Sequence, residues 1–70
     1  MDLIGKPVIV VLKVGVEYRG ILKTCDAQMN LKLLEVQEWK DGKMTAEFGN
    51  TEIKKEEMLS MRVEISKKIV

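Results

Sequence analysis

Apolar residues recur along this chain in short runs that suit strands. The run from 7 to 13 is β-branched or apolar at nearly every position, which predicts a strand that is covered on both faces. Pro7 opens this run, and a residue that cannot donate to a sheet ladder suits the first position of a strand. A helical repeat of 3.6 residues is absent over any length, and at most residues 2–5 form one helical turn.

The next two predicted strands are both bent. The second covers residues 16–25 and follows a turn supplied by Gly15. Gly20 lies in its middle, where glycine often marks a sharp bend or a bulge. The third strand covers residues 29–39, and its alternation changes phase at two adjacent leucines. A slip of one residue reverses the faces of a strand, so a bulge or strong bend is expected there too.

A hairpin separates the third strand from the rest of the chain. The Asp-Gly pair at 41–42 is a strong hairpin signal. Apolar residues then alternate from 44 to 53, with a break in phase at Gly49. A polar turn over 54–57 leads to the fifth strand, in which apolar residues alternate from 59 to 65.

These patterns predict an all-β fold. Five bent antiparallel strands in so short a chain favour a small closed or nearly closed barrel, because closure removes exposed strand edges. We interpret residues 1–70 as one domain, with a core over about 4–65 and a short tail over 66–70. The alternative architecture is another small barrel, of the SH3-like or OB type.

The composition changes this picture in one respect. The chain has 70 residues, of which 46% are apolar and 33% charged, as expected of a globular protein. A domain this small buries only about 60% of its unfolded surface, so its core needs support. The single cysteine, Cys25, cannot form an internal disulfide, and without histidine a zinc site would need carboxylate ligands. Oligomerisation is the remaining support, and no metal or cofactor is expected.

Other features bear on location and on partners. A free Cys25 fits a reducing compartment, nucleus or cytoplasm. The first residues lack the basic and long apolar regions of a signal peptide. Apolar runs stay well short of the roughly 20 residues that span a bilayer, so no membrane partner is expected. The net charge is only +1, so affinity for RNA would have to come from a local site or from an assembly.

An enzyme is not expected. Cys25 has no histidine partner, which excludes a Cys/His nucleophile. The chain has no glycine-rich phosphate loop and no paired-carboxylate motif in a recognisable context.

Among the polar loop residues, Asp26 can accept backbone N–H bonds and so fix the shape of its loop. Trp39 lies near a hairpin end, and we expect its side chain to be exposed or to face another subunit.

Four groups of residues carry a resemblance to a known family. They are GKPV at 5–8, LKxGxEYxG over 12–20, Leu22, and Asp26 with Met29-Asn30. Together they resemble the first motif of the Sm and Sm-like (LSm) family, and within it they are most similar to the F-type members and their Sm-like paralogue. The resemblance covers about residues 4–65.

The second Sm motif is divergent. Where the family has Ile-Arg-(Gly or Cys)-Asn-Asn before the last strand, this chain has Ile-Lys-Lys-Glu-Glu at 53–57. Lysine therefore replaces arginine, a second lysine replaces the small residue, and glutamates replace the asparagines. The N-terminal helix that is typical of the family is almost absent.

The resemblance implies an Sm fold whose last two strands pair with neighbours to close a ring, usually of seven subunits. Such rings bind uridine-rich single-stranded RNA around the pore, in the core particles of pre-mRNA splicing or in other RNA processing. The neighbours would be other Sm or Sm-like subunits in a hetero-heptamer, or further copies of this chain. By position in the motifs, Gln28 would stack on a base, Asn30 would read its edge, and Lys54 with Lys55 would supply charge.

The residue types at these positions weaken the expected pocket. Gln28 offers a flat amide without an aromatic face, and Lys54 keeps the charge of arginine but loses its planar fork. Each lost stacking contact costs about 1–3 kcal/mol. An alternative therefore stays open, in which the protein is an assembly subunit that binds its neighbours by strand addition with little base recognition of its own. In that case Asp26 and Asn30 only shape a turn, as Gly15 and Gly20 do.

Overall fold

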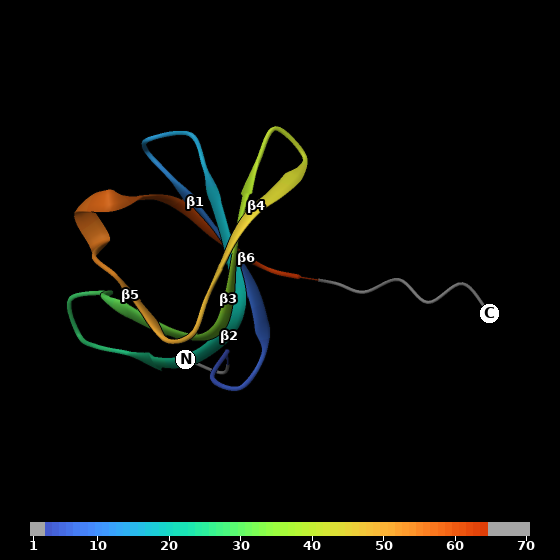
Figure 1. Cartoon of the computed structure of the whole chain (residues 1–70). Helices are drawn as coiled ribbons and strands as arrows, with labels where there is room; N and C mark the ends of the chain where they lie inside the picture. The colour runs from blue at the N-terminus through green and yellow to red at the C-terminus, as the bar shows by residue number, and fades with distance from the viewer. Residues whose placement is uncertain (1–2, 65–70) are drawn as a thin grey trace.

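The fold is an antiparallel sheet that bends around a single core (Figure 1). The computed structural model describes residues 3–64. The strands are β1 (Pro7–Leu12), β2 (Glu17–Cys25), β3 (Leu31–Lys40), β4 (Lys43–Phe48), β5 (Thr51–Ile53) and β6 (Met58–Val63), and a 3₁₀ turn, η1 (Lys55–Glu57), precedes β6. Their order in the sheet is β4-β3-β2-β1-β6, and β5 pairs with β3. The predicted all-β fold of bent antiparallel strands is confirmed.

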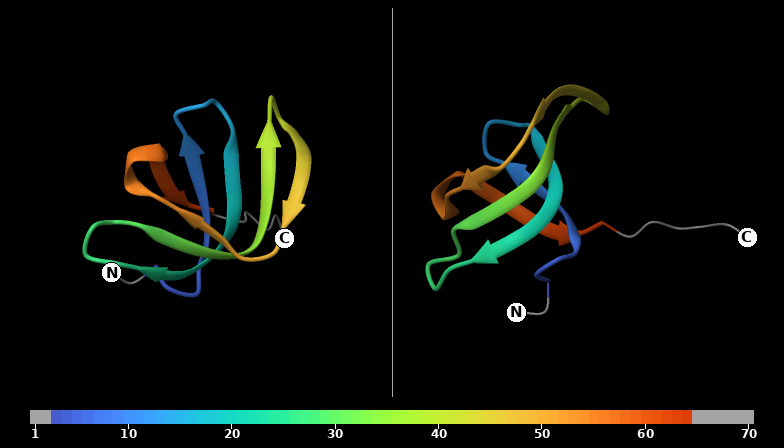
Figure 2. Two further views of the ribbon diagram at one scale, coloured as in Figure 1. Left: turned by 60° about the vertical axis from the view of Figure 1, so that its left-hand side comes forward. Right: turned by 60° about the horizontal axis from the view of Figure 1, so that its bottom comes forward.

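The long strands β2 and β3 curve together, as both views in Figure 2 show. Their pairing register shifts between Arg19 and Ile21, where Gly20 lies, and again between Leu22 and Thr24. A Cβ atom at Gly20 would lie 2.7 Å from the backbone oxygen of Leu34 and 3.1 Å from Cγ2 of Val36. A side chain is therefore excluded at the bend, because the backbone of β3 approaches β2 too closely.

The predicted fourth strand is divided in two. β4 pairs with the second half of β3, from Val36 to Lys40, while β5 pairs with its first half, from Leu31 to Leu33. Between the two halves, Glu35 has a positive φ of 52°, and β3 changes direction there. One straight strand cannot follow both halves, so the chain breaks between β4 and β5.

Two shorter features complete the backbone. Residues 3–5 form a turn, which the N–H of Lys6 closes by donating to the backbone oxygen of Leu3 at 3.0 Å. Asp41 and Gly42 both have positive φ and form the two-residue hairpin loop between β3 and β4, as their residue types favour. Among residues 3–64, no helix is long and apolar enough to cross a membrane. The predicted tail and the last residue of the predicted fifth strand lie outside the described residues.

The core lies on the concave face of the sheet. Its buried side chains come from every part of the bend: Val8, Val10, Leu12, Leu22, Leu31, Leu33, Val36 and Ile53. On the convex face, Trp39 is half-buried, because the guanidinium of Arg19 lies 4.2 Å from the centroid of its ring. The structure does not bear out a fully exposed Trp39, because Arg19 covers part of it from the neighbouring strand; the alternative, that Trp39 faces another subunit, stays a prediction.

Strands β4 and β6 end the β4-β3-β2-β1-β6 path of the sheet, and β5, which lies off this path, also pairs with β3 alone. Strands β4 and β6 both carry exposed apolar side chains: Met44 and Phe48 on β4, and Leu59 on β6, which is 67% exposed. An unpaired edge with apolar side chains is a surface to which another strand can be added.

Candidate nucleic-acid interface

The loop over residues 26–30 is organised by one carboxylate. Oδ1 of Asp26 accepts hydrogen bonds from the backbone N–H groups of Gln28 and Asn30, both at 2.9 Å. Its Oδ2 accepts a third from Nδ2 of Asn30 at 3.1 Å. Met29, inside the loop, has a φ of 67°, a left-handed conformation that lets the chain reverse within so few residues.

These hydrogen bonds also set the charge state of Asp26. The bond from the backbone N–H of Asn30 is the main cause that lowers the pKa of this carboxyl, and the Asn30 side chain, the Gln28 backbone and the charge of Lys54 act in the same direction. Asp26 is therefore ionised around neutral pH, and a carboxylate only accepts hydrogen bonds.

The side-chain amide of Asn30 has one allowed orientation. Its Oδ1 accepts the backbone N–H of Lys55 at 3.0 Å, while Nδ2 donates to the Asp26 carboxylate. Because one partner only donates and the other only accepts, turning the amide over would break both bonds. An amide can donate two hydrogens and accept at two lone pairs, so one N–H and one lone pair of Asn30 stay free for a ligand.

The facing turn is fixed by Glu57. Its Oε1 accepts the N–H of Lys54 at 3.4 Å, and its own N–H donates to the backbone oxygen of Lys54 at 2.9 Å. The N–H of Lys13, in the loop after β1, donates to the backbone oxygen of Glu57 at 3.0 Å. Glu57 thus ties the turn both to itself and to the first hairpin.

Loop 26–30 and this turn enclose an open cavity of 410 Å³. All four residues that the sequence predicts for RNA binding line it: Gln28, Asn30, Lys54 and Lys55. A fifth lining residue, Glu56, was missed, since the polar turn gives no signal for which way each side chain points. Asp26 supports the cavity from behind the loop, while Gly20 lies in the β2 bend and Gly15 in the β1–β2 turn, with a φ of 93°.

The chemistry of this cavity is polar and mixed in charge. Two ammonium groups and one carboxylate surround two side-chain amides. Such a set can hydrogen-bond the edge of a base and contact phosphate, but the cavity has no aromatic or guanidinium lining group for stacking. Groups of three or more His, Cys, Asp or Glu side chains that could hold a metal are absent among residues 3–64.

Comparisons with known proteins agree with this architecture. The chain is 53% identical over 47 residues to the small nuclear ribonucleoprotein F of Schizosaccharomyces pombe, a match that covers 67% of this chain and 60% of that protein. The chain therefore spans less than two thirds of this relative. The predicted similarity to the F-type members is confirmed.

Two solved structures have the same fold. The Pyrococcus abyssii Sm protein in complex with a uridine heptamer superposes with a TM-score of 0.85 at 29% identity, covering 89% of this chain and 87% of that one. A heptameric archaeal Sm protein gives a TM-score of 0.83 at 34% identity, with 91% and 93% covered. The model of the LSM domain matches residues 1–63, and the chain therefore belongs to the LSM domain family of Sm and Sm-like proteins.

Proposed function

We propose that this protein is a subunit of an Sm-type ring that binds uridine-rich single-stranded RNA in the cavity between loop 26–30 and the turn after β5. The observation that carries the proposal is the Asn30 amide, which two partners hold in one orientation with a donor and an acceptor left over. The similar archaeal protein that was solved with a uridine heptamer supports the choice of ligand.

Recognition of uridine follows from hydrogen-bond complementarity. The pairing edge of uracil presents one N–H donor between two carbonyl acceptors. The free N–H and the free lone pair of Asn30 match a carbonyl and the N–H of that edge. Cytosine presents a ring acceptor instead of the N–H at the same place, so one of the two bonds is lost. Lys54 and Lys55 act on the phosphates and do not discriminate between bases.

The ring is the second part of the proposal. The free edges of β4 and β6 carry apolar side chains that need cover, and a heptameric archaeal relative shares the fold. Addition of one subunit's β4 to the next subunit's β6 would pair both edges. The subunit acts by binding and is not an enzyme. We place it in RNA processing in the nucleus or cytoplasm, with splicing as the process suggested by the F-type relative.

Titration of labelled oligouridine and oligocytidine at two salt concentrations tests the proposal. The wild type should prefer uridine, and Asn30→Ala should weaken binding and narrow that preference. Lys54→Ala should weaken binding to both oligonucleotides alike and make the salt dependence shallower by about 0.7 in log–log slope, as expected for one phosphate contact. A wild type that binds both oligonucleotides equally, or neither, would refute base recognition at this cavity.

A second function is favoured by what lines the cavity. Gln28 and Lys54 offer no stacking surface, and Glu56 adds a negative charge. An assembly subunit binds its neighbours and leaves base recognition to them. Such a subunit needs no stacking surface and no positively charged cavity. In that case the purified chain forms a ring of defined native mass but fails to crosslink to oligouridine.

A further inference from the structure

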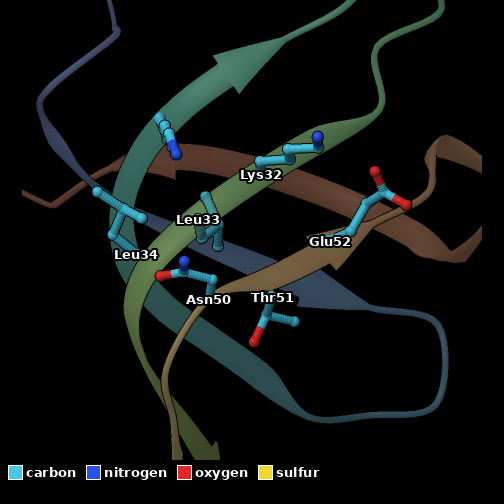
Figure 3. Close-up of a pocket in the computed structure, with 7 residues that line it drawn as sticks. Lys32, Leu33, Leu34, Asn50, Thr51 and Glu52 are labelled. Atoms are coloured by element: carbon cyan, nitrogen blue, oxygen red, sulfur yellow. The ribbon is translucent and has the colours of Figure 1, made fainter.

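A second cavity lies beside the first, on the outer face of β3 and β5 (Figure 3). Its volume is 280 Å³. The lining residues that matter here are Lys23 from β2, Lys32 and Leu34 from β3, and Asn50, Thr51 and Glu52 from the segment that contains β5. The Sm motifs in the sequence do not account for this cavity.

Strand pairing brings two ammonium groups to it. Lys32 pairs with Thr24 across β2 and β3, and Lys23 lies beside that pair, where the register shifts. Both ion pairs found among residues 3–64 use Glu17, with Arg19 and with Arg62. Neither Lys23 nor Lys32 therefore has a carboxylate partner within the described part of the chain, and the two positive charges lie on neighbouring strands.

Glu52 does not neutralise them by contact. It pairs with Lys32 in the register of β3 and β5, and Figure 3 shows both side chains extending toward the same end of the cavity. Even so, the two form no ion pair. With two lysines and one glutamate, the cavity has a formal charge of +1. The side-chain amide of Asn50 and the hydroxyl of Thr51 add uncharged hydrogen-bond donors to the cavity.

Both cavities lie along one track. Side chains alternate between the faces of a strand, and Leu31 and Leu33 are buried while Lys32 is exposed. Asn30 and Lys32 therefore project to the same outer face, about 7 Å apart along the strand. Across from them, Ile53 is buried between the exposed Glu52 and Lys54. A strand of RNA leaving Asn30 along this track reaches the second cavity directly.

We propose that the second cavity binds a backbone phosphate of the RNA next to the nucleotide held at Asn30. Lysine ammonium groups act as mobile point charges that suit phosphate, and amide and hydroxyl donors can complete the contact. The cavity has no aromatic lining group for a base to stack on, so the contact does not depend on sequence. Glu52 opposes it and limits its strength. The inference rests on the proposed function, which supplies the RNA.

The test compares two double variants on uridine and on oligouridine. One removes both cavity charges, Lys23→Ala with Lys32→Ala. The matched control, Lys40→Ala with Lys43→Ala, removes the same charge at the β3–β4 hairpin, where these residues pair with each other. The ligands are the nucleoside uridine, which carries no phosphate and can fill only the Asn30 cavity, and an oligouridine of about ten nucleotides. Circular dichroism verifies that each variant is folded, which is expected because all four lysines are exposed.

The cavity variant should bind the long oligouridine about three- to tenfold more weakly, with a salt slope shallower by about 0.7, and should bind uridine as the wild type does. Glu52→Gln should strengthen binding of the long ligand only. Equal losses in the cavity and control variants, or equal losses on both ligands, would overturn the inference, because general electrostatics would then explain them.

Titration with inorganic phosphate is a further experiment. Phosphate binding that the cavity variant loses, with unchanged binding of the long oligouridine, would identify a free-anion site and also overturn the inference.

Failure of the proposed function gives a different result from failure of this inference alone. If the wild type binds neither ligand, the proposal for the Asn30 cavity falls and this inference falls with it. If the wild type binds both ligands and the cavity variant matches it, only the phosphate contact is refuted.

Discussion

Oδ1 of Asn30 accepts the backbone N–H of Lys55 at 3.0 Å, and this bond joins loop 26–30 to the turn before β6 across 25 residues of sequence. The same amide is the proposed reader of uridine. The two walls of the candidate site are thus held together by the residue that recognises the ligand, so the order of the site and its specificity have a common origin.

Hydrogen exchange should reveal this bond. Asn30→Ala removes the acceptor of the Lys55 N–H, and we expect that amide to exchange faster by a factor of about 5 to 10, which corresponds to the roughly 1 kcal/mol of a typical net hydrogen bond. The matched control is Asn50→Ala, which removes a side-chain amide from the neighbouring cavity. Unchanged exchange at Lys55 in Asn30→Ala would show that the bond does not order the turn.

Acid should destabilise loop 26–30 by protonating the Asp26 carboxylate. Hydrogen bonds lower the pKa of this carboxyl below its ordinary value of 3.8. The ionised Asp26 carboxylate therefore stabilises the folded loop fully above that value. This stabilisation is lost as the pH falls through the lowered pKa of the folded state. The amide resonances of Gln28 and Asn30 should titrate with a midpoint below 3.8, and Asp26→Asn should abolish that titration. A midpoint at or above 3.8 would contradict the hydrogen-bonding scheme.

Much of this site follows from the sequence, because it is local. Asp26 and Asn30 are close enough in sequence to bond within one loop, and the family motifs place Lys54 and Lys55 opposite them. The role of Glu57 could not be predicted in the same way. Its carboxylate accepts the N–H of Lys54, but a helix-capping pattern led by lysine lacks the usual serine, threonine, aspartate or asparagine at that position.

The fold shows the same division between local and tertiary causes. Alternating residues predict the strands, and Gly20 marks the bend of β2. The separation of β4 from β5 depends on the turn of β3 at Glu35, and the cover over Trp39 depends on a cross-strand neighbour, Arg19. The second cavity needs three strands in register. None of these is encoded in a short window of sequence.

A tyrosine at position 28 should strengthen RNA binding. Gln28 lines the candidate cavity and is exposed, so Gln28→Tyr adds a stacking surface without displacing the core. Stacking on one base contributes about 1–3 kcal/mol, and oligouridine affinity should rise accordingly. Ala27→Tyr, one residue earlier and outside the cavity lining, is the control for a general aromatic effect. Equal gains from both variants, or no gain from either, would count against base stacking at this site.

The bend at Gly20 should tolerate no side chain. A Cβ atom there meets the backbone oxygen of Leu34 at 2.7 Å, and forcing a group into a packed site costs typically about 1–3 kcal/mol. Gly20→Ala should lower the free energy of unfolding by that amount in urea denaturation. Gly49→Ala is the matched control, because a Cβ at Gly49 meets nothing within 4 Å, and it should be neutral within about 1 kcal/mol. Similar effects in the two variants would show that the close approach at Gly20 is not limiting.

Finally, the edges of β4 and β6 have complementary charges as well as apolar faces. Through the registers of β1 to β4 and β6, Glu47 and Arg62 lie on the same convex face of the sheet, one on each edge. If antiparallel pairing of β4 with the next copy's β6 sets Glu47 opposite Arg62, it also sets Phe48 opposite Met61. Both pairs are favourable, and an opposite-charge pair contributes about 0.2–1 kcal/mol at each joint.

A charge-swap experiment decides whether this chain closes a ring with itself. Glu47→Arg alone and Arg62→Glu alone should each lower the native mass measured at micromolar concentration, because like charges then face each other at every joint. The double variant should restore the larger mass, although the 3.9 Å contact between Arg62 and Glu17 is lost with it. A wild type that remains a monomer when pure would instead assign the edges to other Sm-like subunits. A wild-type oligomer that the single variants leave intact would exclude this register.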